Sequence, residues 1–270
     1  MLNRQTFVQR FGFRAVFGMV HLKPLPGAPL FGGSMDEVIA AAVADTRAIV
    51  AGGCDGIMVE NFGDRPFAKD HVGPETVAAM TRVLTILAAE SRVPLGVNVL
   101  RNDAAAALAI AAAMGAAFIR VNVHTGAMLT DQGLIEGKAA ETMRTREKLA
   151  PAAAVFADHL VKHAVPLAAV DPGQSAKDLR LRGLADAVIV SGAETGAAPD
   201  VERLKLLRDV LPDAPLLLGS GLTAANAAEF GEADGAIVGT AIKRGADVDA
   251  PVVREEVDRI VTAFKVSGVR

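Results

Sequence analysis

Tryptophan and tyrosine are both absent from the 270-residue chain, and cysteine occurs only once. Without these two aromatic residues the chain lacks the usual stacking platforms for bases and sugars. The lone Cys54 excludes an intramolecular disulfide and a cysteine zinc cluster, and this count fits a cytosolic (cytoplasmic) setting. Cys54 falls between a predicted helix and a predicted strand, so we assign it a packing role.

Two further absences narrow the class of protein. The formal net charge is −3, so no basic surface argues for nucleic acid as a partner. No apolar run reaches the roughly 18 residues of a membrane-spanning helix, because the alanine-rich stretch 104–117 is too short. Residues 1–21 carry three arginines within their apolar pattern and lack a small-residue cleavage site. We therefore expect neither a transmembrane segment nor a signal peptide.

Short apolar, β-branched runs alternate with longer, amphipathic stretches rich in alanine and leucine. Such runs are typical of parallel strands that are buried on both faces. Eight runs predict strands, at 15–22, 56–61, 94–100, 117–123, 153–159, 187–192, 215–221 and 235–242. Helices are predicted over 34–51, 74–89, 200–210 and 251–264, and others open after 103, near 175 and after 223.

Eight such units in a chain of this length predict the α/β class and a single (β/α)8 TIM barrel over residues 1–270. A doubly wound sheet is the alternative, but HLKPLPG after the first strand is not the glycine pattern of that fold. Ser34, with Glu37 three residues later, predicts a capping box at the first barrel helix.

Three segments lie outside the regular alternation. Residues 1–14 form an N-terminal extension, which we expect either to plug the bottom of the barrel or to pair with another subunit. Residues 23–33 and a long loop insertion at 125–150 both leave carboxyl ends of strands, where barrels build active sites. We interpret the first as a rim and the second as a lid, whose Arg144 and Arg146 would close over an anionic ligand. The alternative for the second segment is a contact with another subunit, which would make the protein a homo-oligomer.

Strand alternation predicts which side chains point into the barrel. In FIRVNV and the following residue, Ile119, Val121 and Val123 have one parity, while Arg120, Asn122 and His124 have the other. The apolar set is expected to face the helices and the polar set the lumen. By the same reasoning Met19 and His21, Gly96 and Asn98, and Phe156 and Asp158 point inward. In GIMVEN (56–61) alternation leaves the direction open, and we choose Met58 and Glu60 as the inward pair, with Val59 and Asn61 outward.

The predicted strand ends therefore carry a ring of polar residues. Its members are His21, Glu60, Asn98, Asn122, Asp158, Ser191, Ser220 and Thr240. A buried carboxylate without partners costs several kcal/mol, so we expect Glu60 and Asp158 at the same mouth, each paired with a cation such as Arg120 or Lys162 or with an amide. The simpler interpretation is that strand ends meet water and are polar for that reason alone.

The last two strands end in LLLGSG and GAIVGT, which predict a phosphate site. Gly219, Gly221 and Gly239 allow the backbone to approach a ligand closely, and Ser220 and Thr240 lie beside them. Loops after strands seven and eight form the recurring phosphate site of this fold, and helices opening near 223 and after 240 would add positive dipole ends. The alternative is that these glycines only make room for tight turns.

Several strings together resemble the BtpA/SgcQ family over essentially the whole barrel. They are GMVHLKPLPGAP (18–29), GCDGIMVENFGDRPF (53–67), GVNVLRND (96–103), FIRVNVHTG (118–126), FADHLVKHA (156–164), GLADAVIVSGAETG (183–196) and LLLGSGLTAANAAE (216–229). The resemblance implies a barrel similar to ribulose-phosphate-binding barrels. It also implies either an orphan enzyme of sugar metabolism or a role in photosystem I biogenesis.

The leading hypothesis is an enzyme, an isomerase, lyase or transferase of a small phosphorylated, sugar-like metabolite. Glu60 or Asp158 would be the general base or acid, while Arg120, Asn98, Asn122 and Lys162 would orient hydroxyls and stabilise negative charge. His21 belongs to the same candidate site. The second hypothesis is a non-catalytic assembly factor. No cofactor is predicted. A third hypothesis is a metal-dependent hydrolase, in which His21, Asp158 and His163 would bind a divalent metal ion.

Overall fold

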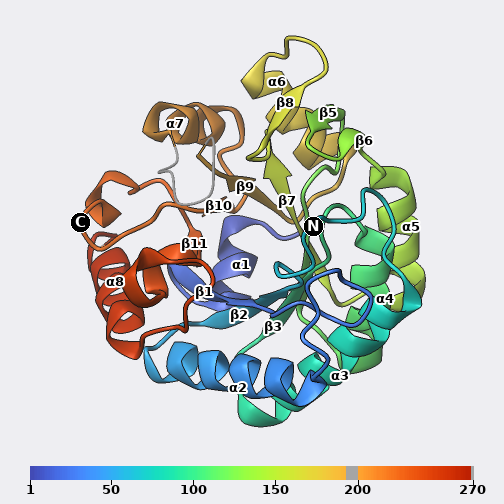
Figure 1. The fold of residues 1–270 in the computed structure, drawn as a ribbon. Coiled ribbons are helices and arrows are strands. Elements are labelled where there is room, and N and C mark those ends of the chain that lie inside the picture. Colours follow the sequence, from blue (N-terminus) through green and yellow to red (C-terminus); the bar gives the residue numbers. More distant parts are fainter. Residues whose placement is uncertain (193–199, 269–270) are drawn as a thin grey trace.

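The structure is a computed structural model that describes residues 1–192 and 200–268. Its barrel strands are β1 (Ala15–His21), β2 (Gly56–Glu60), β3 (Leu95–Asn98), β4 (Phe118–Val121), β7 (Ala154–His159), β9 (Ala187–Val190), β10 (Leu216–Leu218) and β11 (Gly235–Val238). Within the described ranges these eight are parallel and close on themselves, because β1 pairs with both β2 and β11 (Figure 1). The predicted single (β/α)8 barrel is confirmed.

Helices surround the barrel between successive strands (Figure 1). They are α2 (Met35–Ala51), α3 (Pro74–Glu90), α4 (Ala104–Met114), α5 (Ala139–Leu149), α6 (Pro172–Lys177), α7 (Val201–Val210) and α8 (Arg254–Val266); α6 continues into a π-helix over Asp178–Arg182. The Ser34 hydroxyl accepts a hydrogen bond from the Glu37 N–H at 3.2 Å, which is half of the predicted capping box.

The predicted helix after residue 223 is not formed. Only a 3-10 turn, Ala227–Glu229, follows β10, and another, Thr240–Ile242, follows β11. Thr223 and Asn226 exchange two side-chain hydrogen bonds with each other's backbone, and the Asn226 amide also donates to the Gly221 carbonyl at 2.9 Å. These local bonds replace the helical ones. No α-helix dipole therefore points at the predicted phosphate site from either loop.

The N-terminal helix α1 (Arg4–Phe11) closes the bottom of the barrel, and Figure 1 shows it inside the ring of strands. Its side chains Phe7 and Phe11 are buried in the lumen cluster. There they meet Phe17, Phe118 and Phe156, with ring centroids between 5.5 and 6.4 Å apart across the two sets. The lumen thus has an aromatic floor, and the polar strand ends lie above it.

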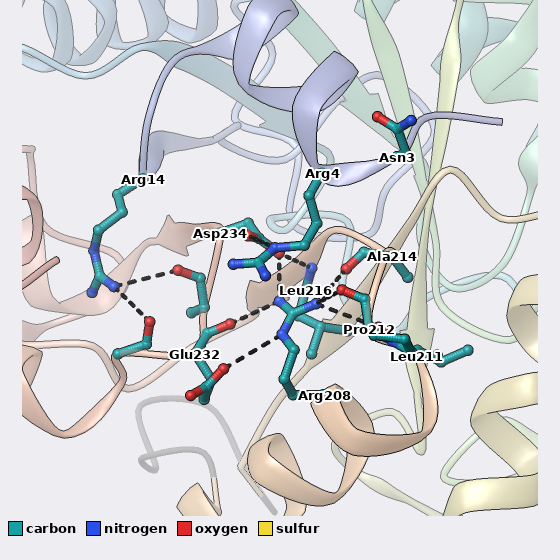
Figure 2. A network of polar contacts seen from close by, with 12 residues as sticks. Asn3, Arg4, Arg14, Arg208, Leu211, Pro212, Ala214, Leu216, Glu232 and Asp234 are labelled. Carbon is teal, nitrogen blue, oxygen red and sulfur yellow. Dashed lines mark hydrogen bonds and ion pairs between the residues drawn. The ribbon is translucent and has the colours of Figure 1, made fainter.

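Ion pairs fix α1 to the end of the barrel (Figure 2). Asp234, one residue before β11, accepts hydrogen bonds from Arg4 at 2.8 Å, Arg208 at 2.6 Å and the Leu216 N–H at 2.9 Å. Arg208 also donates to the carbonyls of Ala214 and Glu232. The buried carboxylate is therefore fully engaged, which keeps this end of the barrel closed.

The insertion at 125–150 contains more order than a loop. Strands β5 (Ala127–Thr130) and β6 (Gly133–Glu136) form a hairpin, and β8 (Ala164–Pro166) joins it to make a small antiparallel sheet. Its buried face contains Val123, Met128, Ile135 and Val161. The sheet packs beside the barrel mouth and contacts the segment that follows β7.

The remainder of the insertion is helix α5, and its arginines do not reach the mouth as expected. Arg146 forms an ion pair with Asp186 at 3.1 Å. Asp186 directly precedes β9 and also accepts the N–H groups of Leu2 and Val155, so this pair lies at the bottom of the barrel. The expectation that Arg146 closes over a ligand is wrong, because α5 runs away from the mouth. Arg144 donates to a carbonyl of its own helix.

Candidate active site

A buried ion pair lies at the centre of the mouth, on β4 and β7. The Arg120 guanidinium donates to both oxygens of Asp158, from Nε and Nη2, at 2.9 Å each. Asn122 donates to the same carboxylate at 3.0 Å, and the Ser191 hydroxyl donates at 3.4 Å. Arg120 and Asn122 therefore point inward as predicted, and Asp158 has the cationic partner that its burial requires.

Glu60, at the end of β2, is held by an amide and not by a cation. The Asn98 side chain donates to it at 2.5 Å, and His21 Nε2 lies 3.9 Å from its other oxygen. Glu60 therefore has the amide partner that was one of the two kinds expected, and Arg120 is committed to Asp158 instead. The neighbouring strand β3 supplies Asn98 directly opposite Glu60.

His21 is a neutral member of this group. Burial, reinforced by the charges of Lys243 and Lys162, lowers the pKa of His21 to about 3. Its ring stacks on Phe62, with centroids 4.6 Å apart, and Gly239 leaves room for it because an added Cβ there would meet His21 at 3.1 Å. At neutral pH the imidazole can therefore donate or accept a hydrogen bond without adding charge.

Lys162 enters the mouth from the segment between β7 and β8. Leu160 and His163 on either side of it have φ values of 52° and 55°, the left-handed region that non-glycine residues rarely adopt. Val161 anchors the turn in the small sheet. Burial, together with the charge of Arg120, lowers the pKa of Lys162 to about 8. Among the described residues no hydrogen-bond or ion-pair partner of its Nζ is found.

One cavity joins these groups to the predicted phosphate site. It has a volume of about 130 Å³ and is lined by His21, Glu60, Phe62, Arg120 and Lys162, together with all five predicted phosphate-site residues, Gly219, Ser220, Gly221, Gly239 and Thr240. The carboxyl ends of strands that are far apart in the sequence, β1, β2, β4, β10 and β11, therefore line the same cavity. Asn98, Asn122 and Asp158 lie beneath it as hydrogen-bonding partners of its walls.

The glycines of this cavity have different roles. The Gly219 N–H donates to the Val190 carbonyl at 2.8 Å, and a Cβ at this position would meet Ser191 Oγ at 2.2 Å. Gly219 therefore makes room and offers no donor, contrary to expectation. Gly221, with φ of 70°, does adopt a conformation that favours glycine. Within the described part of the chain, the N–H groups of Gly221, Gly239 and Thr240 have no acceptor.

Residues 13–266 match the profile of the BtpA family. The chain belongs to the BtpA family. It is 46% identical over 251 residues to the photosystem I biogenesis protein BtpA of Synechocystis sp., covering 92% of this chain and 86% of that protein. An uncharacterised protein of Archaeoglobus fulgidus is 47% identical over 253 residues, with 93% and 99% covered. A mitochondrial protein of Caenorhabditis elegans is 33% identical over 240 residues, with 86% of each chain covered.

Solved structures similar to this BtpA-family chain share its fold. The 7,8-dihydropteroate synthase of Vibrio fischeri superposes with a TM-score of 0.60 at 14% identity, covering 96% of this chain and 95% of that one. The N-(5'-phosphoribosyl)anthranilate isomerase of Pyrococcus furiosus has a TM-score of 0.54 at 14% identity, with 93% and 98% covered. At such identities the likeness shows the barrel alone.

The side chains proposed as metal ligands do not gather into a metal site. Among the described residues no three His, Cys, Asp or Glu side chains are placed to hold a metal ion, so His21, Asp158 and His163 do not form the alternative site. His124 lines neither of the cavities with Glu60 and Lys162, and its Nε2 lies 2.7 Å from the Gly183 carbonyl, so the expectation that it points into the lumen is wrong. No described helix is long and apolar enough to cross a membrane.

One cationic residue of the mouth escaped the sequence analysis. Arg101 follows β3 and is only 6% exposed. It belongs to no strand, so alternation assigned it no direction, and it was not recognised as part of the site. Its Nη2 donates to the Lys162 carbonyl at 2.9 Å, which links the loop after β3 to the segment that carries Lys162. The motif VNVLRND was the only signal that included it.

Proposed function

We propose that this BtpA-family protein is an enzyme that acts on a small phosphorylated, sugar-like metabolite. The observation that carries the proposal is the cavity lined both by the turns after β10 and β11 and by Glu60, His21 and Lys162. Pockets of this kind, with a few convergent polar groups and a titratable group of shifted pKa, are the usual candidates for an active site.

The phosphate would bind at the turns after β10 and β11. The N–H groups of Gly221, Gly239 and Thr240 have no acceptor among the described residues, and a phosphate would supply one for each. Each such charge-assisted bond contributes about 1.5–3 kcal/mol. Lys162 lines the same cavity and adds a positive charge when protonated.

Glu60 is the better acid–base candidate of the two carboxylates. Both oxygens of Asp158 are already engaged by Arg120, Asn122 and Ser191, so Asp158 acts by positioning Arg120. Glu60 lines the cavity, and Asn98 fixes its orientation. A proton would move between the substrate and Glu60, while Arg120 and Lys162 stabilise the negative charge that develops. Isomerase, lyase and transferase reactions all use such steps.

A non-catalytic assembly factor is the second candidate, favoured by the name of the Synechocystis relative. The related chains of Archaeoglobus and Caenorhabditis carry no such name. The buried polar groups at the mouth also favour an enzyme, because an assembly factor has no need of an ion pair and an unpaired lysine inside a small cavity.

A ligand screen followed by a turnover assay tests the proposal. Phosphorylated sugars and their dephosphorylated counterparts are compared by thermal shift, and compounds that bind are followed by NMR for conversion. We expect only phosphorylated compounds to stabilise the protein, and Glu60→Gln to keep binding while losing most turnover. Equal stabilisation by the dephosphorylated compounds contradicts the phosphate site. Binding without conversion by the parent protein favours the assembly factor.

A further inference from the structure

A second cavity adjoins the first at the barrel mouth. It has a volume of about 320 Å³ and shares Glu60, Phe62, Arg120 and Lys162 with the phosphate cavity. Arg101, Arg65, Phe67, Leu100, Asn122, Asp131 and His163 complete its lining. The two cavities therefore meet at these four side chains, and a substrate that spans both would contact them.

Arg101 is a buried cation without a carboxylate partner. Its side chain makes one hydrogen bond, from Nη2 to the Lys162 carbonyl, and its buried Nε has no acceptor. No ion pair of Arg101 is found within the described residues. Arg120, which is equally buried, is bound by both oxygens of Asp158. An unpaired buried charge is costly, so a fold retains one where something else supplies the counter-charge.

The carboxylates of this cavity act on Arg101 only from a distance. Burial lowers the pKa of Arg101, and the charges of Asp131 and Glu60 offset this only in part, because neither carboxylate forms an ion pair with it. Arg65 is partly exposed and paired with Asp249 at 3.0 Å. Glu60 is held by Asn98, and Asp131 accepts a hydrogen bond from Gln132 at 2.5 Å. Lys162 has no partner for Nζ among the described residues, so two cations that line the same cavity, Arg101 and Lys162, lack a direct ionic contact there.

We propose that the cavity beside Arg101 binds a carboxylate of the substrate, so that the substrate is a phosphorylated carboxylic acid. The planar guanidinium carries five N–H donors, of which the structure engages one in a hydrogen bond, so Arg101 retains donors for the two oxygens of a carboxylate. Lys162 lies between the two anionic groups, because it lines both cavities. The proposal rests on the phosphate site described above and names the second group that the substrate carries.

Matched ligand pairs test the proposal by isothermal titration. 3-Phosphoglycerate and glycerol 3-phosphate differ only in a carboxylate against a hydroxymethyl group, and 6-phosphogluconate and sorbitol 6-phosphate repeat the comparison over a longer chain. We expect the carboxylate to bind at least about tenfold more tightly in one of the pairs. Arg101→Met should abolish the preference, Arg101→Lys should retain part of it, and the exposed control Arg82→Met should keep it.

Thermal unfolding gives a second readout that does not depend on the choice of ligand. Because Arg101 is unpaired, Arg101→Met should unfold at the same temperature as the parent or higher, whereas losing a structural arginine would lower that temperature. Equal affinities within both pairs, while inorganic phosphate binds, overturn the carboxylate site and leave the phosphate site standing. A preference that survives Arg101→Met overturns it as well. Failure of phosphate and of all four compounds to bind overturns both sites together.

Discussion

Replacing Lys162 by methionine should make the protein more stable at neutral pH. The folded structure holds this ammonium group in a mostly buried position near Arg120, which lowers the pKa of Lys162 from its ordinary 10.5 to about 8. A shift of this size corresponds to about 3 kcal/mol, and partial contact with solvent reduces it, so we expect a gain of about 1–3 kcal/mol. For a domain of this size that gain raises the unfolding temperature by roughly 2–12 °C.

The gain should depend on pH in a defined direction. Below pH 8 the lysine is protonated in both states, so the folded state carries the full cost of its charge. Between pH 8 and 10.5 the unfolded chain binds more protons than the folded one, and the stability of the parent therefore rises with pH. The advantage of Lys162→Met should shrink over this interval and vanish above it.

Thermal unfolding from pH 6 to 10.5, followed by circular dichroism, measures this difference. Lys23→Met, at an exposed lysine, is the matched control and should show no such trend. Phosphate binding should weaken in Lys162→Met although its stability increases, as expected where a strained site serves function. A variant that is less stable than the parent at pH 7, or whose advantage does not change with pH, would refute this account of Lys162.

Three further predictions address the mouth and the floor of the barrel. Arg120→Met leaves the Asp158 carboxylate buried without its cation and should cost about 3–5 kcal/mol in urea unfolding; a loss under about 1 kcal/mol would contradict the ion-pair argument. Gly221→Val places a β-branched residue at φ of 70° and should weaken phosphate binding at least about tenfold with an unchanged circular dichroism spectrum; the control Gly231→Ala, where a side chain meets open space, should bind normally. Phe11→Ala should cost about 3–5 kcal/mol in urea unfolding while phosphate affinity at the opposite end stays unchanged.

The barrel could be predicted from sequence because its strands have a strong local signal. Apolar β-branched runs bounded by glycine and proline located all eight strands, and alternation then gave the inward direction of Arg120, Asn122 and Asp158. These predictions rely on properties of single strands. They hold because a shift of one residue along a barrel strand would turn all its inward side chains outward and bring the apolar, helix-facing side chains into the lumen.

The remainder depends on contacts between segments that local patterns do not describe. The run after Thr223 looked helical, but the reciprocal bonds of Thr223 and Asn226 favoured a turn. His124 has the parity of Arg120 and Asn122 in the sequence, yet its ring contacts the Gly183 carbonyl, on a segment that alternation within one strand does not describe. Arg101 became a candidate only when the structure showed its burial and its missing partner. The hairpin of the insertion was missed because its strands, AMLT and GLIE, are not the continuous apolar, β-branched runs that mark the barrel strands.

The aromatic floor has a consequence for how the chain is made. Helix α1 leaves the ribosome before all the barrel strands, but its binding site includes Leu217 and Ile237, which lie on the last two of these strands. Its Phe7 and Phe11 therefore remain uncovered during most of translation and find their place only when β11 closes against β1. Nascent chains that stall before residue 235 should expose these rings to chaperones, so the step that completes the barrel also ends its exposure to aggregation.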